Sequence, residues 1–319
     1  MGKHIVLAIK IAAALAFAVI AVTVLIKEFS NTTPGEIVRG LGYVGWGTVA
    51  IAFIWTVFAF TAVAPYDGLA LHYVGRKLLF RRSAMSSTTT YAISNLLGFP
   101  VFTGNALRLW LYGHWGLGAA EVVVAAVVTT VVCNIVLAMI AGISLMIEPM
   151  AFSTIVGLGS NWLVALGGVL VLVGATLAGV LMFGPRKVRI GTFTFSRPGL
   201  LLLPHMLFCV VDYSATAAVL YVLIGPALDM NFVQFVALFS TAKTIGIVSN
   251  VPGGLGVFEA VIASTMASVS AVDLAVALIA YRCIFYLAPF LVAAAFVAVH
   301  VLRRASRRTS PRQPSHPSP

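Results

Sequence analysis

Long, predominantly apolar runs, each close to the length of a bilayer-spanning helix, dominate this chain. Residues 119–147 and 199–224 are two of them, and charged residues make up only 9% of the 319 positions. Ordinary soluble domains carry roughly 25% charged residues, and a helix needs about 20 apolar residues to cross the hydrocarbon core. In hydrocarbon, only a helix or a closed barrel pairs all of its backbone groups. The sequence therefore predicts an all-α, polytopic membrane bundle of about seven or eight helices.

The predicted spans follow the apolar runs in chain order. The run at residues 5–26 is long and lacks a cleavage site leading into a soluble domain, so we expect a span there and not a signal peptide. Further spans are predicted at 41–64, 119–147, 161–183, 199–224, 232–248, 256–271 and 274–302. We expect residues 66–83 to form a short interfacial helix with a basic face, or a solvated charge run that only sets topology.

Domain organisation follows from where the apolar pattern stops. Residues 1–302 are predicted to form a single transmembrane domain. The tail at 303–319 is rich in Arg, Ser and Pro, so it has no apolar face to bury and is expected to be a disordered cytoplasmic segment.

Two stretches break the apolar pattern with proline and glycine. The first, near 84–105, overlaps SNLLGFPVFTGNALR at 94–108, and the second, within 232–270, includes SNVPGGLGVFE at 249–259. Broken backbone survives at membrane depth only inside protein or beside a water-filled cavity. Paired breaks in the two halves of a membrane protein point to a transport site. We therefore expect two discontinuous or re-entrant segments beside a central, lipid-accessible cavity.

Basic residues set the expected orientation. Fifteen of the twenty Lys and Arg residues lie at the N-terminus, at 76–82, at 186–197 and in the tail. The positive-inside rule places these clusters in the cytoplasm, which is consistent only if the 84–105 segment returns to its own side. Both termini are then cytoplasmic. The net charge of +11 reflects topology, and without a basic stripe interleaved with aromatics no nucleic-acid partner is expected.

Enzyme and metal motifs are absent from the sequence. Cys133, Cys209 and Cys283 lie singly in apolar segments, and His205 and His300 also lie on apolar segments. With no CxxC motif and no local His/Cys cluster, we interpret them as core residues and expect neither a metal nor a cofactor. No catalytic residue is predicted, because no nucleophile, metalloprotease or nucleotide motif is present.

Charged residues within the apolar segments are the candidate site, because such residues are costly at membrane depth. Asp212 lies near the middle of 199–224 and either faces a cavity that attracts a cation or forms a buried salt bridge with Arg282 or Lys243. Glu259 follows the second break, where a helix-start carboxylate is also favoured by the macrodipole.

Phosphate-binding elements accompany these carboxylates. Arg108 and Lys243 could hold a phosphate, although Arg108 is also explained as a topological or interfacial arginine. Half-helix N-termini at the breaks present free N–H groups to an anion. A zwitterionic or cationic phospholipid headgroup would use both signs of charge, and an ion-coupled carrier of a small solute fits nearly as well. The remaining candidate residues are Asn95, Gly104, Asn250, Gly253, Gly254, Gly256 and Arg282.

Several runs resemble the transmembrane region of lysylphosphatidylglycerol synthases/flippases, the multiple peptide resistance factor family, and of its stand-alone relatives. They are YDGLALHYVGR at 66–76, YAISNLLGF at 91–99, TGNALR at 103–108, SNVPGGLGVFE at 249–259 and AYRCIFYLAP at 280–289. The resemblance covers roughly residues 41–302. It implies a bacterial inner-membrane protein that moves aminoacylated phospholipid between leaflets and so contributes to resistance to cationic antimicrobial peptides.

Two departures limit what the resemblance implies. Full-length members end in a soluble aminoacyl-transferase domain that this sequence lacks, so synthase activity is not expected, and Asn105 stands where the family is expected to have Gly or Asp. A membrane subunit that works with a separate soluble aminoacyl-transferase is therefore an alternative, as is an accessory protein without a substrate. The expected partner is a membrane phospholipid, and a homo-oligomer stays open.

Overall fold

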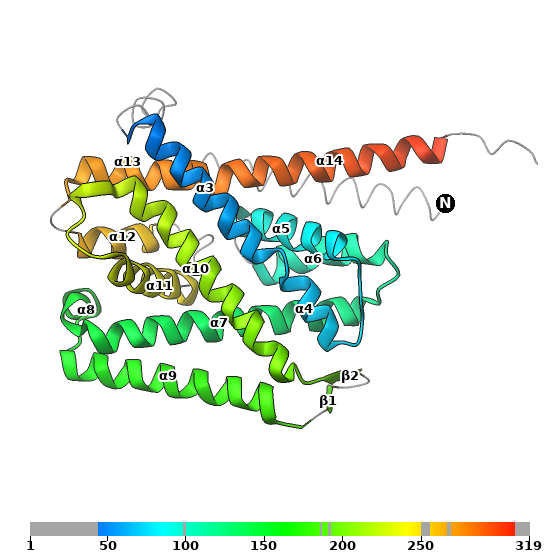
Figure 1. Cartoon of the computed structure of the whole chain (residues 1–319), viewed down its shortest axis with the longest axis horizontal. Helices are drawn as coiled ribbons and strands as arrows, with labels where there is room; N and C mark the ends of the chain where they lie inside the picture. Colours follow the sequence, from blue (N-terminus) through cyan, green and yellow to red (C-terminus); the bar gives the residue numbers. More distant parts are fainter. Residues whose placement is uncertain are drawn as a thin grey trace, which may run out of the picture.

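The computed structural model describes residues 44–97, 100–185, 187–190, 193–249, 256–266 and 269–309, which form a helical bundle (Figure 1). The predicted span at 5–26 and the candidate residues Asn250, Gly253 and Gly254 lie outside the described residues. Within the described part, five helical stretches are long and apolar enough to cross a membrane: Trp46–Tyr73, Ala119–Ile147, Ser160–Phe183, Gly199–Ile224 and Ala271–Val301. The all-α membrane bundle predicted from the sequence is confirmed.

The first described span consists of two consecutive helices. Helix α3 (Trp46–Val63) leads directly into α4 (Tyr66–Tyr73), which buries Tyr66, Asp67 and Leu71 among others. The interfacial helix predicted over 66–83 is therefore wrong for its first half, because α4 packs into the core. The basic residues follow it, in the connection to the next helix and in that helix's first turn.

The first predicted break separates two helices that pack against each other. Helix α5 (Phe80–Leu97) and α6 (Pro100–Gly113), which we call hairpin A, lie side by side in Figure 1. Proline suits the first position of α6, where its missing N–H costs no intrahelical bond. Helix α5 is polar yet buried, and its hydroxyls bond to backbone carbonyls, as Thr88 does to Ala84 and Ser87 does to Val63 of α3.

The second predicted break also lies between two packed helices. Helix α11 (Phe232–Val248) and α12 (Val257–Thr265) form hairpin B. The predicted bounds 232–248 are confirmed, whereas the helix predicted over 256–271 ends at Thr265. Gly256 precedes α12 with φ +77°, a left-handed conformation that favours glycine. Both discontinuous segments predicted from the sequence are therefore present.

Helix α7 (Ala119–Ile147) packs along α9 (Ser160–Phe183), and the short α8 (Pro149–Val156) connects them (Figure 1). Glycines let the two backbones approach: a Cβ added at Gly167 would lie 2.4 Å from the Gly142 carbonyl oxygen. Small residues at such a crossing are typical of membrane helices. A two-stranded antiparallel hairpin, β1 (Lys187–Ile190) and β2 (Phe193–Ser196), follows α9.

Helix α10 lies at the centre of the packing. It spans Leu202–Ile224 after the short η1 turn (Gly199–Leu201), contacts α3, α4, α7, α11 and α13, and is followed by η2 (Gly225–Ala227). Helix α13 (Ala271–Tyr281) continues through a π-helical turn, η4 (Arg282–Leu287), into α14 (Ala288–Thr309). Helix α14 therefore runs past the predicted domain boundary at 302, and residues 310–319 lie outside the described residues.

Candidate functional site

Asp212 is the centre of a buried polar cluster at mid-span of α10. Its side chain accepts hydrogen bonds from the hydroxyls of Tyr66 (3.2 Å) and Tyr91 (3.1 and 3.2 Å to its two oxygens). Thr216, one turn along α10, donates a further bond at 3.3 Å. Asp212 is 1% exposed, and among the described residues no basic side chain forms an ion pair with it. The predicted salt bridge of Asp212 to Arg282 or Lys243 is therefore wrong.

Arg108 of hairpin A pairs with Asp67 of α4. The Arg108 Nη2 lies 2.9 Å from Asp67 Oδ1, and Nε contributes bonds of 3.1 Å to both carboxylate oxygens. Tyr112, one turn along α6, donates a 2.7 Å bond to the same carboxylate. Tyr66 bonds to Asp212, and the next residue, Asp67, bonds to Arg108. Helix α4 therefore joins the central cluster to hairpin A.

Other polar groups of hairpin A surround Arg108. A Cβ added at Gly104 would lie 3.1 Å from Ser94 Oγ and 3.3 Å from Arg108 Nη1, so glycine leaves room for these side chains. The Asn95 amide nitrogen and the Thr90 hydroxyl are buried, and neither finds a hydrogen-bond partner among the described residues. Buried polar atoms without protein partners are typical of positions filled by water or by a ligand. The predicted residues Gly104 and Arg108 thus lie together on α6, and Asn95 lies on the facing helix α5 of the same hairpin.

Glu259 of hairpin B carries two interactions. Its Oε2 accepts a 2.9 Å bond from the Gly256 N–H, which caps the first turn of α12. Its Oε1 accepts a 3.0 Å bond from Arg282 Nε, and the Arg282 guanidinium also lies 4.6 Å from the centre of the Tyr286 ring. The interpretation of Glu259 as a helix-start carboxylate is confirmed, and Arg282 adds a buried counter-charge to it.

Lys243 lies on α11, which packs against α10. Its ammonium nitrogen is 4.8 Å from the centre of the Tyr213 ring, the distance of a cation–π contact. No carboxylate of the described residues forms an ion pair with Lys243. Lys243 and Asp212 are thus charges of opposite sign, on adjacent helices, that have no ion-pair partner within the described structure.

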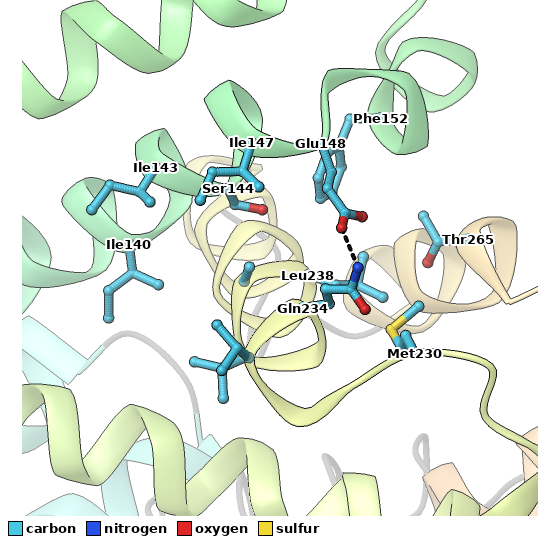
Figure 2. Close-up of a pocket in the computed structure, with 13 residues that line it drawn as sticks. Ile140, Ile143, Ser144, Ile147, Glu148, Phe152, Met230, Gln234, Leu238 and Thr265 are labelled. Atoms are coloured by element: carbon cyan, nitrogen blue, oxygen red, sulfur yellow. Dashed lines mark hydrogen bonds between the residues drawn. The ribbon is translucent and has the colours of Figure 1, made fainter.

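An apolar cavity of about 200 Å³ lies elsewhere, between the end of α7, α8 and hairpin B. Its lining is mostly aliphatic, with a polar end where Gln234 Nε2 donates a hydrogen bond to Glu148 (Figure 2). Lining residues Ile147 and Val233 are 70% and 75% exposed, so the cavity opens on the outer surface of the bundle. None of the predicted site residues lines it.

The structure brings together two cysteines and a histidine that the sequence presents as isolated core residues. Cys133 of α7 and Cys209 of α10 have sulfur atoms 3.3 Å apart, and the ligand atoms of Cys133, His205 and Cys209 all lie within 4.8 Å of one another. Such a group could hold a metal ion. The i, i+4 spacing of His205 and Cys209 on one helix was the available signal, but Cys133 lies 76 residues away from Cys209.

The predicted site residues therefore form separate groups. Hairpin A holds Asn95, Gly104 and Arg108, the centre holds Asp212, and hairpin B and the π-helical turn hold Gly256, Glu259 and Arg282. Sequence reasoning missed Asp67, Tyr66 and Tyr91, which contact Arg108 or Asp212 from other elements.

Comparison with known proteins adds two relatives. The chain is 28% identical over 277 residues to an uncharacterised protein of Synechocystis sp., covering 80% of this chain and 84% of that protein. It is 28% identical over 249 residues to inner membrane protein YbhN of Escherichia coli, covering 74% and 75% of the two chains. No protein-family model matches the chain. With its apolar spans, the chain is a helical membrane protein similar to an inner membrane protein of a bacterium.

Proposed function

We propose that this protein moves a phospholipid with a charged headgroup, such as lysylphosphatidylglycerol or a related aminoacylated lipid, between the leaflets of a bacterial inner membrane. The observation that carries the proposal is the Asp212 cluster: a buried carboxylate at mid-span that is held by hydroxyls and has no basic side chain within ion-pair distance among the described residues. Ionisable groups at this depth usually mark a substrate pathway.

Asp212 and Lys243, which have no ion-pair partner among the described residues, match the two signs of charge in such a headgroup, a cationic amine and an anionic phosphate. In the proposed complex, the lipid amine approaches Asp212 and the phosphate approaches Lys243. An amine bonded to a buried carboxylate makes a charge-assisted hydrogen bond, which is stronger than a neutral one. This refines the expectation from the sequence, in which Arg108 and Glu259 also held the headgroup.

Arg108 and Glu259 take a different role in this proposal. Each already has a counter-charge within hydrogen-bond distance, Asp67 for Arg108 and Arg282 for Glu259. A headgroup would have to break these pairs to use either residue. We therefore assign the two ion pairs to positioning hairpins A and B around the headgroup path. We assign the Asn95 amide nitrogen and the Thr90 hydroxyl, which have no hydrogen-bond partner in the described part of the chain, to polar contacts along that path.

The lipid chains have a separate requirement, which is an apolar surface open to the bilayer. The aliphatic cavity beside hairpin B, with its mouth at Ile147 and Val233, supports an amphipathic cargo better than a small ion. Moving a cationic lipid to the outer leaflet would lower the negative surface potential that attracts cationic peptides. The basic clusters support an orientation with both termini in the cytoplasm.

The test is translocation in liposomes that contain the purified full chain. Fluorescent lysylphosphatidylglycerol becomes accessible to a membrane-impermeant quencher as it moves to the outer leaflet. We expect the rate to rise at least about tenfold over protein-free liposomes, and to exceed the rate for labelled phosphatidylglycerol, whose headgroup has no amine for Asp212. Translocation of lysylphosphatidylglycerol at the protein-free rate would contradict the proposal.

A further inference from the structure

We infer that Cys133, His205 and Cys209 form a binding site for Zn²⁺ that joins α7 to α10. The three residues supply two sulfur atoms and one imidazole nitrogen, all within 4.8 Å of one another. Cys209 and His205 are 0% exposed, which distinguishes this group from a chance cluster on the surface. Two thiolates and one imidazole are a ligand set that zinc commonly uses when a fourth position is left open.

The hydrogen bonds of His205 leave one ring nitrogen available. The Tyr73 hydroxyl lies 3.2 Å from both the Leu201 carbonyl oxygen and His205 Nδ1. Because a hydroxyl has a single hydrogen and a carbonyl can only accept, both contacts are satisfied when Tyr73 donates to Leu201 and His205 Nδ1–H donates to Tyr73. His205 Nε2 then carries a lone pair. This atom is buried and has no hydrogen-bond partner among the described residues.

This arrangement matches the usual second contact of a metal-binding histidine. A ligating histidine normally donates its other ring N–H to a nearby acceptor, which fixes the tautomer and the orientation of the ring. Tyr73 of α4 provides that acceptor here. The elements involved, α4, α7 and the first half of α10, pack against one another (Figure 1).

The distances need only small adjustments to accept zinc. Two sulfurs bound tetrahedrally at about 2.3 Å from one zinc ion lie roughly 3.8 Å apart, and a sulfur and an imidazole nitrogen lie roughly 3.6 Å apart. The two sulfur atoms, which are 3.3 Å apart, must therefore separate by about half an ångström. A pair of ligand atoms at the 4.8 Å limit of the group must approach by about one ångström. Side-chain rotation provides movements of this size without moving the helices.

Charge decides which metal fits best. On binding, each thiol releases its proton to solvent, so that two thiolates meet the ion. With Zn²⁺ the complex of two thiolates and a neutral imidazole has no net charge, whereas with Cu⁺ it would carry one negative charge. A net charge is costly inside a membrane bundle, which favours zinc over a monovalent ion.

The test is metal content and affinity of the purified full chain in detergent. We expect one zinc ion per chain after incubation with zinc and removal of the excess, measured by elemental analysis. Cys133→Ser, Cys209→Ser and His205→Ala should lose it. Cys283→Ser is the matched control, since Cys283 lies in the π-helical turn outside the cluster, and should retain it. Tyr73→Phe should keep the ligands and lower zinc affinity about 10–100-fold.

Cobalt substitution of the unaltered protein gives a second measurement that does not depend on a variant folding. Co²⁺ bound by two thiolates should show thiolate-to-cobalt charge-transfer absorption in the near ultraviolet. Absence of this absorption together with less than about one tenth of a zinc ion per chain would overturn the inference. Equal zinc content in Cys209→Ser and the unaltered protein would do the same, as would recovery of Cys133 and Cys209 as a disulfide under non-reducing conditions.

Discussion

The Tyr91 hydroxyl lies 3.2 and 3.1 Å from the two carboxylate oxygens of Asp212, so hairpin A contacts the mid-span carboxylate of α10 directly. Helix α10 in turn packs against α11 of hairpin B. A movement of either hairpin would therefore change the surroundings of Asp212. This contact connects hairpin A, and through α10 also hairpin B, to the buried carboxylate.

Removing the Tyr91 hydroxyl should weaken this contact. We expect Tyr91→Phe to lower the free energy of unfolding by about 1–3 kcal/mol, because Asp212 loses one of its donors while it stays buried. Tyr221→Phe is the control, since the Tyr221 hydroxyl donates a single long bond of 3.4 Å to the Met230 carbonyl. Denaturant titration in detergent measures both. Equal losses in the two variants would show that the Tyr91 hydroxyl makes no special contribution.

Breaking the Arg108–Asp67 pair should destabilise the protein more than removing the Tyr91 hydroxyl. Asp67→Asn leaves the Arg108 guanidinium, whose side chain is 12% exposed, without its anionic partner, and should cost about 3–5 kcal/mol. The Arg76–Glu121 pair provides a control of the same kind at the surface, where the Arg76 side chain is 54% exposed. Arg76→Gln should cost about 0–1 kcal/mol, and a comparable cost in both variants would contradict the assigned role of the buried pair.

Glu259 offers a test of the corresponding pair in hairpin B. Glu259→Gln can still accept the Gly256 N–H bond that caps α12, but it removes the negative charge beside Arg282. We expect a loss of about 1.5–3 kcal/mol. Asp273→Asn is the matched control, because Asp273 is an exposed first-turn carboxylate of α13 with no ion pair among the described residues, and should cost under about 1 kcal/mol. In thermal unfolding measured in detergent, Glu259→Gln should therefore have a clearly lower midpoint temperature than Asp273→Asn.

At the crossing of α7 and α9, alanine substitutions of two adjacent glycines should affect stability very differently. A methyl group at Gly167 would lie 2.4 Å from the Gly142 carbonyl oxygen, whereas one at Gly168 meets nothing within 4 Å. Gly167→Ala should therefore destabilise the protein by about 1–3 kcal/mol through overpacking. Gly168→Ala should change stability by less than about 0.5 kcal/mol. Equal free energies of unfolding for the two variants would show that the backbones of α7 and α9 do not approach this closely.

Much of the fold was predictable because a bilayer-spanning helix needs a continuous stretch of mostly apolar residues, which is visible in the local sequence. The apolar run at 119–147 gives the bounds of α7, and residues 232–248 give those of α11. Proline and glycine likewise mark both helix breaks, since their effects on the backbone are local. One exception is 66–83, where the basic residues suggested an interface although Tyr66 and Asp67 are buried.

The site was harder to predict because its contacts join distant residues. Arg108 was singled out correctly as a charge near a broken helix, but its partner Asp67 lies 41 positions earlier. Cys133 and Cys209 likewise meet across two helices without a local motif. Apolar runs locate the spans, while the choice of partner depends on how helices cross, which a single sequence does not encode locally.

The most direct test of the proposed function is the effect of Asp212→Asn on lipid translocation in liposomes. We predict that this variant moves fluorescent lysylphosphatidylglycerol at least about tenfold more slowly than the unaltered protein, because the amine loses its charged acceptor. Asp229→Asn, a change of the same chemistry at an exposed loop position, should keep the original rate. Both variants should elute as monodisperse proteins before reconstitution. Translocation by Asp212→Asn at the rate of the unaltered protein would contradict the central claim.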